Sequence, residues 1–279
     1  MPEIQCKDIG SIRDLLARVA DDSKSWTREG FAEPWFRGVT DACRHKLLPS
    51  ILRDGNEGQE FHLTTKFRLM APSFGAIPDR DHIDQWLFLM QHHRAPTRLL
   101  DWTESPLVAA FFATEKAAKK KVVDQDAAVY ALDPMALNKA ASVTDESGKA
   151  IIPNTWVQSS VLQTIKFAFG TQDEEVIVKG TRVQYLELPC AIYPSTVHAR
   201  VASQRSCFTL HGNDKRDFAS IFRGEPLITE KQLIKYRIPK ENVGSVFNEL
   251  SKLGITYAAL YPDLDGLARE LRYSFGIKG

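Results

Sequence analysis

Polar and charged residues gather in one segment of the chain, directly before a strongly apolar stretch. The string QHHRAPTRLLDWTESPLVAAFFA, which begins at Gln91, holds two adjacent histidines, two arginines and an Asp-Trp-Thr triplet. Folding alone rarely requires so many polar groups ahead of a buried helix. Segments of this kind position side chains on a rigid scaffold while their backbone stays accessible. The pattern therefore predicts a binding or catalytic site within residues 92–103.

Arg37 is a second candidate, in the aromatic run Trp35-Phe36-Arg37-Gly38. Its neighbours indicate a strand, and a buried guanidinium must pair with a carboxylate or point into a cleft because an unpaired charge is too costly. The planar guanidinium binds phosphate or carboxylate through two parallel hydrogen bonds. Arg37 alone leaves a structural ion pair and an anion site equally open. Gly38 would allow either a ligand or another backbone to approach closely.

The polar residues ahead of the helix start at Ser105 also have two interpretations. Asp101 and Thr103 could cap the free N–H groups of that helix, or they could belong to an anion site at its N-terminus. Thr97 and Arg98 follow Pro96, which favours extended geometry at the residue before it. We expect an anionic ligand in a site that combines Arg37 with this segment.

His92 and His93 could be ligands, general bases or structural groups. Adjacent helical residues point in different directions, so we expect at most one of them to face any pocket. No HxxxH or other metal-ligand spacing accompanies them, and no metal is predicted. Later in the chain, Arg200, Gln204 and Phe208 recur at intervals of four. The neutral amide of Gln204 can orient a substrate, but it cannot act as a general base.

Composition excludes several classes of protein. The 279 residues are 43% hydrophobic and carry a formal net charge of +1, so no global field draws the chain to nucleic acid or membrane, although a local patch could still hold nucleic acid. We expect no membrane span and no secretory signal. The four widely spaced cysteines indicate reduced thiols and a cytoplasmic location, with a disulfide framework as the alternative. The GxGxxG, Walker, GxSxG and HExxH motifs are all absent.

Outside these motifs, the sequence predicts a mixture of helices and strands. Apolar spacing predicts helices at residues 11–19, 61–70, 83–92, 105–121, 161–169, 240–253 and 267–275. The helix from Ser105 is expected to end in a solvated charge run, Glu115 to Lys121. Residues rich in β-formers predict strands at 34–39, 127–132, 175–178, 183–188, 190–193, 207–210, 231–238 and 257–260. Because neither an internal repeat nor a low-complexity linker interrupts the pattern, residues 1–279 are predicted to form a single α+β domain.

The chain resembles the FRG domain family, which is named after a Phe-Arg-Gly motif. The resemblance covers nearly the whole sequence apart from residues 138–188, a variable insertion. One departure is the pair Arg94-Ala95, where the family usually has Gly-Leu, which puts a tight glycine turn in doubt. The matching strings are Phe36-Arg37-Gly38, Leu47-Leu48-Pro49 with Arg53, the central string, Arg200 with Gln204 and Phe208-Thr209, and the ending LYPDLDGLA.

The order of these motifs is similar to that of the ADP-ribosyltransferases: an early arginine, a small polar triplet before a helix, then Gln or Glu near a later strand. The resemblance implies a mixed β-sheet core like that of the ADP-ribosyltransferase fold, with helices packed around it. It also implies NAD as substrate. The implied catalytic residues are Arg37, Thr103, Gln204 and, as a rival to Gln204, Glu174. The implied NAD-binding residues are Arg37, Gly38, His92, Thr97, Arg98, Asp101 and Thr103.

Two functions remain in competition. The first is an NAD-dependent mono-ADP-ribosyltransferase, a toxin or phage-defence effector that modifies an intracellular protein or RNA and that an antitoxin could neutralise. The second is a non-catalytic domain that binds a nucleotide or a protein partner. Arg37 and the polar triplet favour the first. Gln204 favours the second, because an amide cannot supply the charge that a glutamate gives an oxocarbenium-like transition state.

Overall fold

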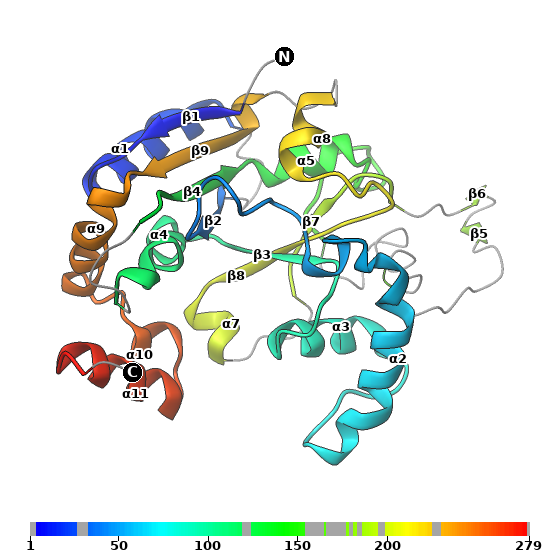
Figure 1. The fold of residues 1–279 in the computed structure, drawn as a ribbon. Coiled ribbons are helices and arrows are strands. Elements are labelled where there is room, and N and C mark those ends of the chain that lie inside the picture. Colours follow the sequence, from blue (N-terminus) through cyan, green and yellow to red (C-terminus); the bar gives the residue numbers. More distant parts are fainter. Residues whose placement is uncertain are drawn as a thin grey trace.

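The computed structural model describes residues 4–26, 33–118, 124–153, 165, 177–178, 181–182, 186–194, 199–224 and 230–277. Seven strands form one mixed sheet in the order β1-β9-β4-β2-β3-β8-β7 (Figure 1). Only β1 and β9 pair in parallel; the other neighbours are antiparallel. The strands are β1 (Gln5–Asp8), β2 (Trp35–Val39), β3 (Leu99–Thr103), β4 (Ala127–Leu132), β7 (Cys190–Ile192), β8 (Ser206–Leu210) and β9 (Leu233–Ile238), with a separate two-residue pair β5 (Ile177–Val178) and β6 (Thr181–Arg182).

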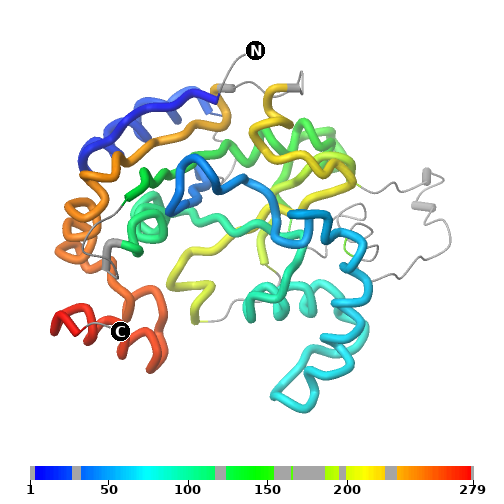
Figure 2. The backbone as a smooth tube through the Cα atoms, viewed as in Figure 1, coloured from blue at the N-terminus to red at the C-terminus, as the bar shows by residue number. Residues whose placement is uncertain are grey.

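Helices cover both faces of the sheet. Side chains of α1, α4 and α9 pack with Phe36 and Val129 on one face, and those of α5 and α8 pack with Trp35 and Trp102 on the other. The tube view shows α2 and the turn after it projecting from the side remote from α1 (Figure 2). The helices are α1 (Ile12–Asp22), α2 (Glu60–Met70), α3 (Ile83–His92), α4 (Pro106–Thr114), α5 (Pro134–Ala140), α7 (Ala199–Ser203), α8 (Phe218–Gly224), α9 (Lys240–Lys252), α10 (Tyr257–Leu260) and α11 (Leu264–Ser274).

Most predicted elements in the described part of the chain are confirmed. The predicted boundaries of α3 and β4 coincide with the observed ones. The prediction for residues 257–260 was wrong, since Tyr257–Leu260 is a helical turn capped by Thr256. Three strands were not predicted: the short N-terminal β1, β3 with its Asp-Trp-Thr triplet, and the two-residue β6. The described part of the predicted strand at 175–178 is β5, Ile177–Val178. Apart from residue 165 and residues 186–188, the predicted helix at 161–169 and the predicted strand at 183–188 lie outside the described residues.

The sheet opens between its two central strands. β2 pairs with β4 along its whole length, from Trp35 to Val39. With β3 it forms a single residue pair, Phe36 opposite Thr103. β3 in turn pairs fully with β8. The divergence of β2 from β3 leaves main-chain groups on one flank of each strand that other partners must satisfy.

Across the described part of the chain, no helix is long and apolar enough to cross a membrane.

Candidate functional site

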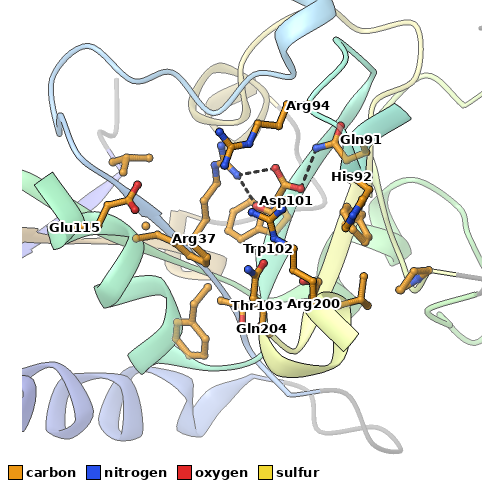
Figure 3. Close-up of a pocket in the computed structure, with 18 of the residues that line it drawn as sticks. Arg37, Gln91, His92, Arg94, Asp101, Trp102, Thr103, Glu115, Arg200 and Gln204 are labelled. Atoms are coloured by element: carbon orange, nitrogen blue, oxygen red, sulfur yellow. Dashed lines mark hydrogen bonds and ion pairs between the residues drawn. The ribbon is translucent and has the colours of Figure 1, made fainter. Parts of the chain in front are cut away.

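A cavity of about 400 Å³ lies beside this opening. Its walls come from β2, β3, α3, the end of α4, α7, β8 and the residue after α10. The close-up shows Arg37, Asp101, Thr103 and Gln204 among the side chains that line it (Figure 3). Side chains far apart in the sequence therefore meet in one place. Of the residues predicted for a site, Arg37, Gly38, His92, Asp101, Thr103 and Gln204 line this cavity.

Arg37 is the most constrained of these side chains. Its Nη1 donates to the main-chain oxygen of Asp101 at 2.6 Å and lies 3.8 Å from the Asp101 carboxylate. The Nε atom is buried and has no hydrogen-bond partner among the described residues. Burial lowers the pKa of the guanidinium below its ordinary value, and the charge of Asp101 opposes that shift. Both interpretations of Arg37 thus apply: it supports the fold, and it keeps hydrogen-bonding capacity and charge for a ligand.

A chain of side chains orients the Asp101 carboxylate. Thr97 donates to the amide oxygen of Gln91, and Gln91 Nε2 donates to Asp101 Oδ1 at 2.9 Å. Thr97 is 1% exposed and does not line the cavity, so its predicted contact with NAD has no support in this geometry. Its hydroxyl positions Gln91 instead, and Gln91 positions Asp101.

Thr103 connects two motifs of the predicted site. Its hydroxyl donates to the main-chain oxygen of Gln204 at 2.7 Å and accepts from the N–H of Ser105 at 3.1 Å. The cap of α4 is Ser105, whose side chain accepts from Val108. Thr103 therefore joins the end of β3 to the segment ahead of β8, and neither it nor Asp101 is the helix cap.

Gln204 faces the cavity, but its side chain is partly committed to the fold. Its Nε2 donates to the main-chain oxygen of Leu260 at 2.9 Å, which ties the α7–β8 segment to α10. This contact orients the amide and leaves Oε1 as its acceptor. Glu174, the rival to Gln204, lies outside the described residues.

Gly38 is explained by the backbone of α4. A Cβ atom at this position would stand 1.9 Å from the carbonyl oxygen of Ala109 and 2.6 Å from the nitrogen of Ala113. Of the two reasons that the sequence left open, the close approach is therefore that of another backbone rather than that of a ligand. Gly38 lets α4 lie directly on β2 and so fixes one wall of the cavity.

The turn after α3 keeps its tight geometry without glycine. Arg94 has φ +61°, and its N–H donates to Gln91 while that of Ala95 donates to Met90. These bonds form the Schellman motif that usually places glycine at this position. The doubt raised by the Arg94-Ala95 departure is thus resolved, at a cost of about 1 kcal/mol for a left-handed non-glycine residue. Arg94 lines the cavity.

His92 lines the cavity, whereas His93, its neighbour, does not. For this cavity the expectation that at most one of the pair faces a pocket holds, but it was wrong for a second hollow, which both histidines line. Among the described residues, no group of three or more His, Cys, Asp or Glu side chains could hold a metal ion.

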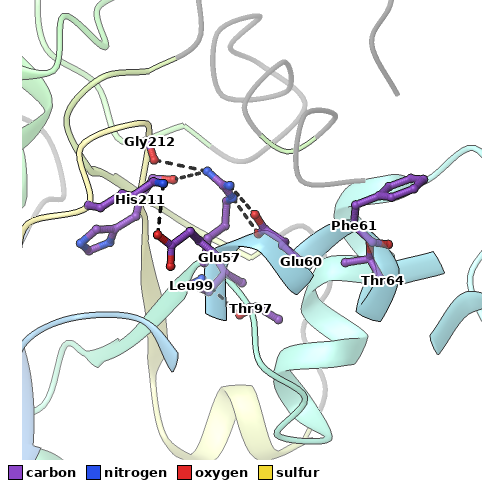
Figure 4. A network of polar contacts seen from close by, with 10 residues as sticks. Glu57, Glu60, Phe61, Thr64, Thr97, Leu99, His211 and Gly212 are labelled. Carbon is purple, nitrogen blue, oxygen red and sulfur yellow. Dashed lines mark hydrogen bonds and ion pairs between the residues drawn. The ribbon is translucent and has the colours of Figure 1, made fainter. Parts of the chain in front are cut away.

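Arg98 is a structural residue. It is 4% exposed and does not line the cavity. Its Nε donates to Glu60 at 2.8 Å, and its Nη1 donates to the carbonyl oxygens of His211 and Gly212 at 3.0 and 3.3 Å. Figure 4 shows this buried network, which joins α2 to the segment after β8. The predicted NAD contact of Arg98 is not supported, because its guanidinium is buried and bonded to Glu60. The sequence could not indicate that a residue 38 positions away would be its partner.

Several lining residues were not predicted. Lys46 and Arg53 add positive charge, and Glu115 adds a carboxylate. Arg94, which lies within the predicted segment 92–103, adds a further positive charge. Partial burial, followed by the charge of Lys116, lowers the pKa of His45. Glu115 was expected to belong to a solvated helix end, yet it lies three residues after Phe112 and shares that residue's face, a spacing that was readable in the sequence. The cavity favours an anion, because five cationic side chains face the two carboxylates of Asp101 and Glu115. The cations are Arg37, Lys46, Arg53, Arg94 and Arg200.

Residues 32–122 match the family model of the FRG domain. This match supports the resemblance seen in the sequence, and it spans β2, α2, α3, β3 and α4. It thus includes Arg37, Asp101 and Thr103, while Gln204 falls outside the FRG match. Comparisons with curated proteins and with solved structures found no match for the chain.

Proposed function

We propose that this chain binds NAD in the Arg37 cavity and transfers its ADP-ribose group to a macromolecule. One observation carries the proposal: the guanidinium of Arg37, whose side chain is 20% exposed, lines a cavity in which the other cations outnumber the carboxylates. Phosphate oxygens are the acceptors that suit such a guanidinium. Arg37 and Thr103 lie on the neighbouring strands β2 and β3, Gln204 lies in the segment just ahead of the next strand β8, and all three line the same cavity.

Transfer of ADP-ribose from NAD requires a protein that positions the two reactants and stabilises the charge that develops on the ribose. The bond between nicotinamide and ribose ionises, its electrons leave with the nicotinamide, and a nucleophile of the acceptor attacks the ribose carbon. The two carboxylates at the cavity, Asp101 and Glu115, are the described groups that can stabilise positive charge on the ribose. An enzyme of this kind fits a toxin or phage-defence effector acting inside a cell, and an antitoxin could neutralise it.

A second candidate function is nucleotide binding without turnover. The observation that favours it is Gln204, which is an amide rather than a carboxylate and whose Nε2 is used on Leu260. Both candidates share the bound nucleotide and differ only in whether its bonds are broken.

One experiment separates these possibilities. NAD binding is measured by calorimetry, and label transfer from NAD is measured with cell lysate or RNA, for the wild type, Arg37→Ala and Glu115→Gln. Arg13→Ala, an exposed change on α1, is the matched control. Binding and transfer that Arg37→Ala abolishes and Arg13→Ala preserves would support the enzyme. Binding without transfer or NAD hydrolysis would leave the second candidate, and no binding at all would contradict both. Thermal melts identify any variant that loses activity by unfolding.

A further inference from the structure

A second hollow opens beside the Arg37 cavity and shares part of its wall. Its volume is about 250 Å³, and its lining comes from the end of α3, from α7, from the residue after α10 and from α11. Four residues line both spaces: His92, Arg94, Arg200 and Tyr261. Since these residues belong to both walls, the two spaces are adjacent, and a ligand that passes Arg94 and Arg200 would reach from the first into the second.

Arginines follow this path in order. Arg37 lines only the first space, Arg94 and Arg200 line both, and Arg269 lines only the second. Figure 3 shows Arg94 and Arg200 beside Arg37 in the close-up. A row of guanidiniums along two adjacent spaces matches a ligand that carries several negative charges in succession.

Tyr261 holds two of these arginines close together. The Cζ of Arg200 lies 4.4 Å from the centroid of the Tyr261 ring, and that of Arg269 lies 5.4 Å from it. The ring itself is 7% exposed, so it is a fixed support for both cations. Both cations line the hollow, where each attracts an anionic group.

The acidic residues of the hollow do not cancel this charge. Asp263 accepts from the N–H of Gly266 at 2.7 Å as the cap of α11, so its carboxylate is committed to the helix start. Asp265 is the other carboxylate of the lining. Three guanidiniums and two histidines therefore surround two carboxylates. Asp263 and Asp265 lie at the start of α11 beside the hollow, and their negative charges would repel a long polynucleotide that ran past it. A ligand with few phosphates avoids this repulsion.

We infer that the hollow binds a second phosphate group of the nucleotide held by Arg37, so that the site selects nucleotides with at least two phosphates, dinucleotides included. This inference rests on the proposed function and adds a substrate class to it. Arg37 binds one phosphate, Arg94 and Arg200 line the passage, and Arg269 binds at the far end.

Calorimetry with NAD, ADP and AMP tests the inference on the wild type, Arg269→Gln and Arg94→Gly. Glycine adopts the φ of +61° at residue 94 without strain, so Arg94→Gly removes the charge while preserving the turn. Arg272→Gln is the matched control, because Arg272 stands on α11 and lines neither space. We expect Arg269→Gln and Arg94→Gly to weaken NAD and ADP by about tenfold or more while AMP changes by less than about twofold.

Equal losses for all three nucleotides, or no loss in either variant although the wild type binds NAD, would overturn the inference and leave the proposed function standing. If the wild type binds none of the nucleotides, the proposed function fails, and inorganic pyrophosphate then tests the hollow alone. Pyrophosphate binding that Arg269→Gln removes supports a phosphate site, and absence of binding overturns it. A short RNA that binds the hollow more tightly than NAD would also overturn the inference, since it would assign the hollow to a polynucleotide.

Discussion

Arg37 spans the opening between β2 and β3 and donates to the main-chain carbonyl of Asp101, 2.6 Å away. The two strands share a single registered pair, Phe36 with Thr103, so the Asp101 carbonyl faces a gap where a strand partner would otherwise stand. Main-chain carbonyls beside a strand need a donor, and the guanidinium supplies the one that a strand partner would otherwise give. One side chain thus holds the sheet open and presents its remaining donors to the cavity.

This double role predicts a split between the effects of two substitutions. Arg37→Lys keeps a cation near the Asp101 carbonyl but lacks the planar fork, so NAD affinity should fall by about tenfold while most thermal stability remains. Arg37→Ala should lose more affinity and also about 1–3 kcal/mol of unfolding free energy, because it leaves the carbonyl unpaired. Calorimetry and urea unfolding measure the two effects. If Arg37→Lys binds NAD like the wild type, the planar fork is not used.

Asp101 provides a test of opposite sign. Its carboxylate is 58% exposed and stands 3.8 Å from Arg37, so it competes with an anionic ligand for the guanidinium. Asp101→Asn keeps the shape and an acceptor for Gln91, and it should raise the affinity for inorganic pyrophosphate by a few fold, as expected for removing one exposed opposing charge. Asp145→Asn, in the turn after α5, is the control. A fall in affinity would mean that the carboxylate itself contacts the ligand.

Gly38 should not tolerate even alanine. The added Cβ would overlap the Ala109 carbonyl, which is main chain and cannot rotate away. We expect Gly38→Ala to destabilise the protein by about 3 kcal/mol or more, at the upper end of overpacking costs. Gly58→Ala meets nothing within 4 Å and is the matched control. Urea midpoints for the pair decide the matter, and equal midpoints would contradict the packing of α4 on β2.

The buried ion pair of Arg98 and Glu60 predicts a marked asymmetry between single and double variants. Removing one partner leaves an uncompensated charge in the core, so Arg98→Met and Glu60→Leu should each cost about 3–5 kcal/mol of unfolding free energy. The double variant should recover part of this loss, because both charges are gone. Chemical denaturation of all three measures the coupling. Additive losses would show that the pair does not interact in the folded protein.

His211 predicts a dependence of stability on pH. Burial, together with the charge of Arg98, lowers its pKa from 6.5 to about 3, and neither ring nitrogen has a partner among the described residues. Between these values the unfolded chain binds a proton that the folded protein does not. Stability therefore rises with pH in this window, with a slope of up to about 1.4 kcal/mol per unit, and it levels off above 6.5.

The matched variant is His211→Leu, which has no titrating group. Lowering the pH from 7 to 5 should cost the wild type roughly 2 kcal/mol more unfolding free energy than it costs this variant. Denaturant titrations at the two pH values give the difference. Parallel losses in both proteins would mean that His211 is protonated in the folded state at pH 5.

The local pattern of residues was sufficient for most elements. Apolar periodicity predicted α3 and β4, and a serine followed by proline predicted the start of α4 at residue 105. The strand β3 was not predicted, because Asp101 disfavours a strand and the polar residues before Ser105 suggested a helix cap, although Trp102 and Thr103 are strand formers. It is a strand because β8 supplies a full ladder of partners more than 100 residues later in the chain. The helical turn at Tyr257 likewise depends on its packing against α4 and α9.

By itself the sequence determined which residues carry charge and which segments are apolar, since these properties belong to each side chain. It therefore indicated Arg37 and the segment around Asp101 as candidates for an anion site. Tertiary structure decided which cations face the cavity, because that depends on contacts between distant segments. Arg98 meets Glu60 in the core and is neutralised there, whereas Arg37 stands at the opening of the sheet and keeps an unpaired donor.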